Sequence, residues 1–150
     1  GKIVSAFDIA CVLAIGADWA NSARGFMFAI GCIQSRSCHT NKCPTGVATQ
    51  DPLRQRALVP EDKAQRVFNF HRNTLRGLAE MLAAAGLEHP AQLDAKHLVR
   101  RMSASEIKLF SQQHVFLKPG ELLDDQQVTG EFYQRMWQMA RTDSLDATQA

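Results

Sequence analysis

Apolar residues recur every three or four positions in several stretches of the chain, which is the spacing that places them on one face of a helix. Residues 6–17 carry this pattern, and Gly16 near its end suits a helix stop, because glycine readily adopts the left-handed conformation of a C-terminal cap. We therefore predict a helix here. Cys11 lies inside it, where a thiol is ordinarily a buried and unreactive core group.

A strand and a second helix are predicted next. Residues 17–21, with the sequence ADWAN, have the character of a short strand, and residues 22–31 that of a turn followed by a helix. This order of elements indicates a βα-type unit whose opening strand is missing. We therefore place residues 1–31 in an α/β zone.

The longest periodic stretch begins near Glu61 and is expected to stop at Gly86. Its apolar face consists of Ala64, Val67, Phe68, His71, Leu75, Leu78 and Leu82. We interpret His71 as an interior histidine rather than a metal ligand, because it lies on this face. The stretch opens a mostly helical region, residues 53–150.

Residues 90–101 predict a further short helix that ends in two arginines, Arg100 and Arg101, facing water. Ser103 and Glu106 then have the spacing of a capping box, in which each side chain accepts the other's backbone N–H.

The last helix is predicted after a turn at Pro119-Gly120. Within it, Phe132, Met136 and Trp137 have helical spacing, and we expect these side chains in the core.

Composition narrows the class of protein. Of 150 residues, 45% are hydrophobic and 21% are charged, as in globular proteins. The net charge of +2 favours neither a nucleic-acid nor a membrane partner, and the apolar runs fall short of the roughly 20 residues that cross a bilayer. Four cysteines are too few for a disulfide scaffold, so we expect a cytoplasmic protein.

Three of the cysteines, Cys32, Cys38 and Cys43, lie close together in residues 32–52, a loop by its Ser, Thr, Asn, Gly and Pro content. Structural zinc sites prefer four ligands and a closer cysteine pair, although His39 or His71 is a conceivable fourth ligand. A disulfide suits a reducing compartment poorly. An iron–sulfur cluster takes thiolates from a loop that wraps it, and three thiolates indicate a three-iron cluster. The residues favour this reading over zinc, a disulfide or plain structural cysteines without excluding them.

The string GCIQSRSCHTNKCPTGVATQDP, together with the residues around it, resembles the end of the FMN-binding domain of glutamate synthases. The resemblance implies an α/β fold, namely the C-terminal fragment of a (β/α)8 barrel, followed by an iron–sulfur loop and a mostly helical extension. It makes Cys32, Cys38 and Cys43 the ligands of a 3Fe-4S cluster. Thr45 and Thr49 are candidate hydrogen-bond donors to the cluster sulfurs.

By the same resemblance, residues 17–21 form the eighth barrel strand, and FMN binds through its phosphate at two neighbouring loops. The first loop contains Gly1 and Lys2. The second contains Ala23, Arg24 and Gly25, where small residues let backbone N–H groups approach the phosphate and Arg24 adds a charged contact.

The family's reaction is the reductive formation of L-glutamate from 2-oxoglutarate and glutamine-derived ammonia, through 2-iminoglutarate. Its partners would be an electron-donor subunit or ferredoxin and the rest of the barrel. We assign no catalytic residue within these 150 residues, because most of the FMN and substrate sites would lie upstream. Two alternatives stay open: a methylamine–glutamate N-methyltransferase-like FMN barrel, and a small stand-alone iron–sulfur electron-transfer or interaction module.

Overall fold

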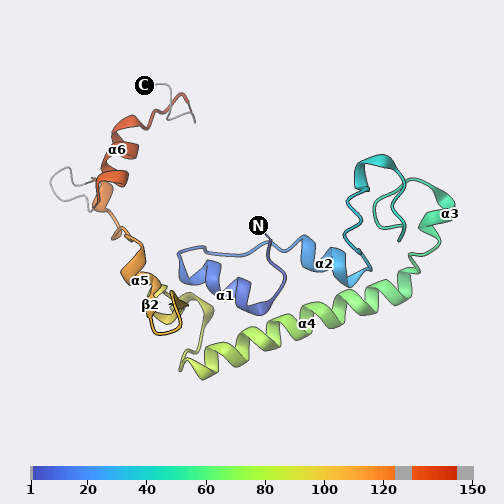
Figure 1. Ribbon diagram of the computed structural model, residues 1–150, viewed down its shortest axis with the longest axis horizontal. Coiled ribbons are helices and arrows are strands. Elements are labelled where there is room, and N and C mark those ends of the chain that lie inside the picture. Colours follow the sequence, from blue (N-terminus) through green and yellow to red (C-terminus); the bar gives the residue numbers. More distant parts are fainter. Residues whose placement is uncertain (1, 124–129, 145–150) are drawn as a thin grey trace. The chain divides into compact units, whose positions relative to one another are not determined.

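The computed structural model describes residues 2–123 and 130–144 (Figure 1). They belong to two compact units, Gly1–His97 and Leu98–Ala150, each of which is considered by itself. The first unit contains α1 (Ala6–Ala14), α2 (Arg24–Ala29), η1 (Cys38–Thr40), α3 (Pro52–Gln55), α4 (Pro60–Ala84), η2 (Pro90–Gln92) and η3 (Ala95–His97), where η marks a 3₁₀ turn. The second contains β1 (Val99–Arg101), β2 (Ile107–Leu109), α5 (Phe110–Gln113), η4 (Glu121–Leu123) and α6 (Glu131–Met139).

Helix α1 has a sequence-local start and stop. At its start the Ser5 hydroxyl accepts the Asp8 N–H at 3.2 Å, and the Asp8 carboxylate accepts the Ser5 N–H at 2.8 Å. At its end Gly16 has φ +105° and donates to Leu13, while the Ala17 N–H donates to the carbonyl of Val12. The predicted helix and its glycine stop are confirmed.

Helices α2 and α4 end in the same way. Gly31 follows α2 with φ +109°, and the next N–H, that of Cys32, donates to the carbonyl of Met27 at 2.9 Å. Gly86 follows α4 with φ +71°, which confirms the predicted stop of the long helix. The glycine after α2 matters for the site, because it turns the chain directly into the cysteine loop.

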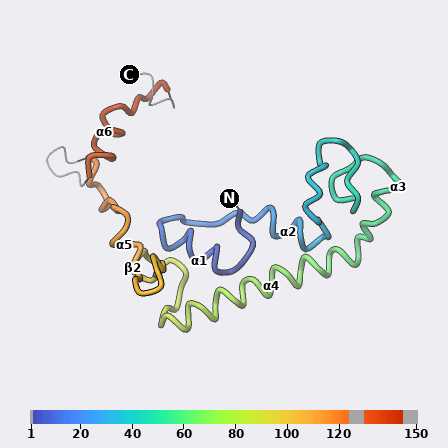
Figure 2. Tube along the Cα trace, viewed as in Figure 1, coloured from blue at the N-terminus to red at the C-terminus, as the bar shows by residue number. Residues whose placement is uncertain are grey.

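Helices α1 and α2 both pack against α4 (Figure 2). Ala10 of α1 forms a buried cluster with Leu78 and Leu82 of α4. From α2, the Phe26 ring meets the Phe70 ring edge to face at a centroid distance of 5.2 Å. The long helix is therefore the platform that places the cysteine loop, which starts at the end of α2.

The apolar face of α4 is only partly covered. Leu78 and Leu82 are buried, whereas the Phe68 and Leu75 side chains are about half exposed. His71, expected in the interior, is exposed, with its ring centroid 5.9 Å from that of Phe26. Cys11 is half-buried rather than fully enclosed.

Residues 17–21 form no strand in the structure, contrary to the prediction. A strand is defined by hydrogen bonds to a neighbour, and in the described part of the chain the single sheet has two strands, β1 and β2, both from the second unit. Membership of residues 17–21 in a barrel thus stays a prediction.

The predicted helix over residues 90–101 is wrong. The segment forms η2 and η3, and then β1 pairs antiparallel with β2 so that Arg100 lies opposite Lys108. A continuous helix is interrupted because the Asp94 carboxylate accepts the Lys96 N–H at 2.9 Å in a local turn. Arg100 and Arg101 are exposed, on a strand instead of a helix end.

The Ser103–Glu106 capping box is also wrong. The Ser103 hydroxyl accepts the Ser105 N–H, and the Glu106 carbonyl accepts the N–H groups of Met102 and Ser103. These bonds close the hairpin loop between β1 and β2, and backbone groups that pair across a hairpin are no longer available for a helix cap.

The turn at residues 119–120 and the final helix α6 are confirmed. The expected burial of its aromatic residues is not found, since the Phe132 and Trp137 side chains are exposed among the described residues. Tyr133 anchors this helix through its hydroxyl, which donates to the Val115 carbonyl at 3.1 Å.

Candidate functional site

A cavity of about 470 Å³ brings the predicted cofactor loops together in the first unit. It is lined by Lys2, by Ala23 and Arg24, and by the two cysteines Cys32 and Cys38. Residues predicted for flavin phosphate and residues predicted for the cluster therefore share one concave surface.

A partly buried hydrogen bond joins the two predicted phosphate loops. The Ser22 hydroxyl donates to the Ile3 carbonyl at 2.8 Å, and Ile3 is buried. This bond fixes Lys2, which precedes Ile3, beside Ala23 and Arg24, which follow Ser22. Of the residues predicted for this site, Gly1 lies outside the described residues.

Gly25 has a packing role that the sequence did not reveal. It is buried and does not line the cavity, and a Cβ added there would lie 2.7 Å from the Phe70 ring and 2.8 Å from the Ser22 hydroxyl. The missing side chain thus lets α2 approach α4, which holds Arg24 at the cavity.

The cavity has a positive lining. Lys2, Arg24 and Arg36 contribute cationic side chains, and no carboxylate is among the described residues that line it. Charges of one sign around a concave surface attract an anion. The cavity is suited to a phosphate or another dianionic group.

Cys32 and Cys38 differ in their surroundings. Cys32 is half-buried, and its Sγ accepts the Gln34 N–H at 3.5 Å. Cys38 is exposed at the start of η1, and it also lines a second cavity of about 420 Å³ together with His39 and Asn41.

Cys43 is buried, and hydrogen bonds to its sulfur lower the pKa of its thiol. The Thr45 hydroxyl lies 3.5 Å from its Sγ. This hydroxyl, followed by the backbone N–H groups of Ala48, Thr45 and Val47, lowers the pKa of Cys43 to about 7. Because the thiolate is the form that binds metal, this environment favours a ligand. Burial and the nearby Asp8 carboxylate have the opposite effect on Cys11, whose pKa is raised.

The donor chemistry of the three cysteines fits an iron–sulfur cluster, but their arrangement does not yet form a ligand set. Among the residues that the structure describes, no three His, Cys, Asp or Glu side chains converge as metal ligands. Thr49, expected to donate to a cluster sulfur, directs its hydroxyl to Asn41 instead.

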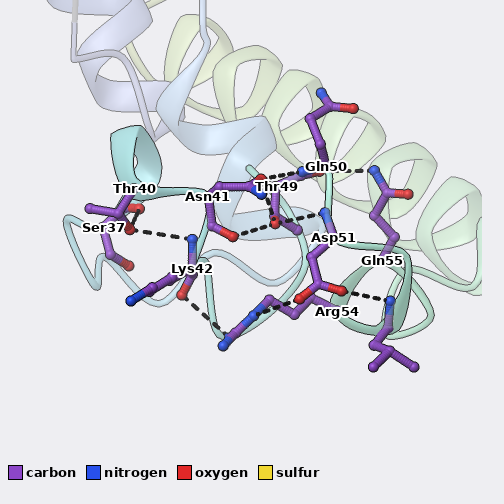
Figure 3. Close-up of polar contacts among 10 residues, drawn as sticks. Ser37, Thr40, Asn41, Lys42, Thr49, Gln50, Asp51, Arg54 and Gln55 are labelled. Carbon is purple, nitrogen blue, oxygen red and sulfur yellow. Dashed lines mark hydrogen bonds and ion pairs between the residues drawn. The ribbon is translucent and has the colours of Figure 1, made fainter.

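Polar contacts join α3 to the middle of the cysteine loop (Figure 3). Asp51 accepts the Leu53 N–H at 2.9 Å, which caps α3, and its carboxylate lies 3.3 Å from the Arg54 guanidinium. Arg54 in turn donates to the Lys42 carbonyl at 3.4 Å.

Sequence reasoning did not reveal the contacts that Asn41 and Arg54 make across the cysteine loop. Asp51 and Pro52 form a recognisable cap signature, which could have revealed α3. Nothing local reveals that α3 reaches back to Lys42 through Arg54, 12 residues later in the sequence.

Comparison with known proteins identifies the class. The conserved region of glutamate synthase matches residues 1–88, more than half of the chain. The chain belongs to the glutamate synthase family. Membership of this family implies flavin and iron–sulfur cofactors in general.

Individual relatives agree with this assignment. The chain is 44% identical over 118 residues to the glutamate synthase large subunit-like protein YerD of Bacillus subtilis (strain 168), covering 78% of this chain and 22% of that protein. It is 31% identical over 112 residues to the archaeal-type glutamate synthase (NADPH) of Dehalococcoides mccartyi, covering 73% and 22%. It is 32% identical over 108 residues to the glutamate synthase (NADPH) large chain of Azospirillum brasilense, covering 65% and 7%.

The chain thus spans about a fifth, or less, of the length of these relatives. No solved structure matches it. Among the described residues, no helix has the length and apolar character needed to cross a membrane.

Proposed function

We propose that the chain is the C-terminal part of a cytoplasmic, FMN- and iron–sulfur-dependent (β/α)8 barrel enzyme that forms L-glutamate from 2-oxoglutarate and glutamine-derived ammonia. Family membership supports a glutamate synthase-like oxidoreductase. The observation that carries the proposal further is the cavity in which Lys2 and Arg24 lie with Cys32 and Cys38. An enzyme that transfers electrons between two cofactors needs their sites next to each other.

Lys2 and Arg24 would hold the FMN phosphate, with the small Ala23 leaving the backbone accessible. The Ser22–Ile3 hydrogen bond sets the distance between the two loops before any ligand arrives. Arg24 is suited to bidentate contact with phosphate oxygens. When bound, FMN supplies the hydride chemistry of the reaction.

Cys32, Cys38 and Cys43 would hold the 3Fe-4S cluster, which supplies a one-electron relay when bound. Cys43 offers a thiolate stabilised by hydrogen bonds near neutral pH. Metal binding at such loops is coupled to their ordering, because ligands from a flexible segment gain affinity only when they come together. We therefore expect cluster binding to draw Cys32 and Cys38 toward Cys43.

We expect the rest of the barrel to pack against an apolar cavity in the first unit. This cavity, of about 560 Å³, is lined by Ile9 and Leu13 of α1 and by Phe70 and Leu75 of α4. Apolar side chains of this kind commonly line the contact between barrel helices and strands. Electrons would come from a donor subunit or a ferredoxin.

The first experiment is anaerobic reconstitution of the protein with iron and sulfide, followed by iron and sulfide analysis and EPR spectroscopy. We expect about three irons per chain and an oxidised three-iron signal. Cys38→Ser should abolish the signal, whereas the matched control Cys11→Ser, in α1 and outside the loop, should keep it. A wild-type protein that takes up only zinc, or a Cys38→Ser variant with full iron content, would refute the cluster assignment.

Flavin binding and reaction are tested separately. Lys2→Ala and Arg24→Gln should each weaken FMN binding, measured by quenching of flavin fluorescence, because each removes a positive charge from the cavity. The reaction is assayed in a protein that also contains the rest of the proposed barrel, where production of L-glutamate from 2-oxoglutarate and glutamine supports the proposed reaction. Production of an N-methylated glutamate from methylamine would contradict it.

A further inference from the structure

Asn41 occupies a special position between the second and third cysteines. It follows η1, which begins at Cys38, and lies two residues before Cys43. Its backbone has φ +61°, in the left-handed region that asparagine tolerates better than most residues. The chain therefore turns at Asn41, between two of the predicted ligands.

The Asn41 side chain ties this turn to the segment after the third cysteine. Its Oδ1 accepts the Gln50 N–H at 2.6 Å and lies 3.0 Å from the Thr49 hydroxyl. The Thr49 hydroxyl also lies 2.7 Å from the Asn41 backbone carbonyl. Figure 3 shows Asn41 facing Thr49 and Gln50 across the loop.

These bonds enclose Cys43. The residues from Asn41 to Gln50 form a ring closed by a side-chain amide, and the buried Cys43 lies on that ring. The N–H groups that face its sulfur belong to Thr45, Val47 and Ala48, which lie on the same ring.

We propose that Asn41 is a positioning residue that closes residues 41–50 of the cysteine loop and keeps Cys43 enclosed by backbone N–H groups. Its role toward a cluster rests on the proposed function. The enclosure of Cys43 is a property of the chain's own hydrogen bonds. The proposal goes beyond the three cysteines, because it gives the uncharged side chain of Asn41 a role in how firmly the loop retains iron.

Two substitutions separate the side-chain oxygen from the backbone conformation. Asn41→Gly removes the acceptor but accepts a positive φ without strain. Asn41→Asp keeps an acceptor oxygen at the same place. Thr49→Val removes the hydroxyl that bonds to Asn41 from the other side of the loop, and it replaces Asn41→Gly as the test variant if Asn41→Gly folds poorly. Asn73→Ala, on the exposed surface of α4, is the control for a generic loss of an asparagine.

The first measurement uses metal-free protein and follows alkylation of Cys43 by iodoacetamide, with the site identified by peptide mass spectrometry. In Asn41→Gly we expect the rate to rise about tenfold, because two hydrogen bonds that close the ring are lost. Asn41→Asp should stay within about twofold of the wild-type rate, as should Asn73→Ala.

The second measurement uses cluster-loaded protein and follows iron release to a chelator, together with the EPR line shape. Asn41→Gly should release iron roughly tenfold faster, the usual size of an effect from a group that orients a metal ligand. Asn41→Asp should restore slow release.

Unchanged Cys43 alkylation in Asn41→Gly and Thr49→Val would overturn the proposal, and so would an Asn41→Asp variant as reactive as Asn41→Gly. If wild-type protein binds no iron, the proposed function fails. Faster alkylation in Asn41→Gly alone would then still support the positioning role.

Discussion

Gly46 gives the sharpest test of the loop structure, because its substitution combines two separate costs. It has φ +78°, where an L-residue is strained by about 1–2 kcal/mol. A Cβ there would also overlap the carbonyl oxygen of Arg54, a backbone atom that cannot rotate away. Forced overlap in a packed region costs about 1–3 kcal/mol. Gly46→Ala should therefore destabilise the closed loop by roughly 2–5 kcal/mol.

Gly86→Ala is the matched control. Gly86 has a similar φ of +71°, but a Cβ there would meet no atom within 4 Å. This variant should show only the strain of about 1–2 kcal/mol, at the end of α4. The difference between the two variants isolates the contact between Gly46 and Arg54.

The assay is hydrogen–deuterium exchange measured by mass spectrometry on peptides from the cysteine loop and from the end of α4. Protection at Gly46, whose N–H donates to the Cys43 carbonyl at 3.3 Å, should fall more in Gly46→Ala than protection near Gly86 falls in Gly86→Ala. The extra loss should be about 5- to 150-fold, the equivalent of 1–3 kcal/mol. Equal losses in the two variants would refute the packing of Gly46 under Arg54.

Three further outcomes are expected. Thr45→Val should raise the pKa of Cys43 from about 7 toward its ordinary 9.0, measured by ultraviolet thiolate absorbance in a protein whose other cysteines are serine; an unchanged pKa would contradict the role of the hydroxyl. Gly25→Ala should destabilise the protein to urea by about 1–3 kcal/mol, because its Cβ would lie 2.7 Å from Phe70; a stability within error of wild type would show that α2 moves freely. Asp8→Asn should lose about 1 kcal/mol or less at pH 7. Backbone N–H groups, first that of Ser5, hold the pKa of Asp8 below 3.8 in the folded protein. The contribution of Asp8 to stability is therefore present above pH 3.8 and disappears as the pH falls through the lower folded pKa. Stability measured by circular dichroism against pH should show wild type and Asp8→Asn converging in acid.

The helices were predictable because their signals are local. The Ser5–Asp8 box and the glycines at 16 and 86 act within a few residues of the helix ends that they define. Hydrogen bonds between residues three or four apart need no distant partner, so α1 and α4 could be placed from the sequence. The helix predicted over residues 90–101 was wrong for the opposite reason. The pairing of β1 with β2 depends on groups that lie up to ten residues apart, and no local signal reveals it.

The candidate site was predictable as a list of residues but not as an arrangement. Spacing and resemblance identified the three cysteines, Lys2 and Arg24. The cavity that Lys2 and Arg24 share with Cys32 and Cys38 depends on the contact between Ser22 and Ile3, 19 residues apart. The sequence also placed Gly25 at a phosphate, whereas its packing contact is with Phe70, 45 positions further along the chain.

The sequence by itself determined where α1 and α4 begin and end, where the thiols lie along the chain and to which family the chain is similar. The tertiary structure decided which of these residues meet. It buried Cys43 and left Cys38 exposed, although both belong to one motif, and it gave Asn41 and Arg54 their roles in closing the loop. The physical reason is that burial and long-range hydrogen bonds depend on partners that only folding brings together. Helix caps, in contrast, depend on residues that are close in the sequence.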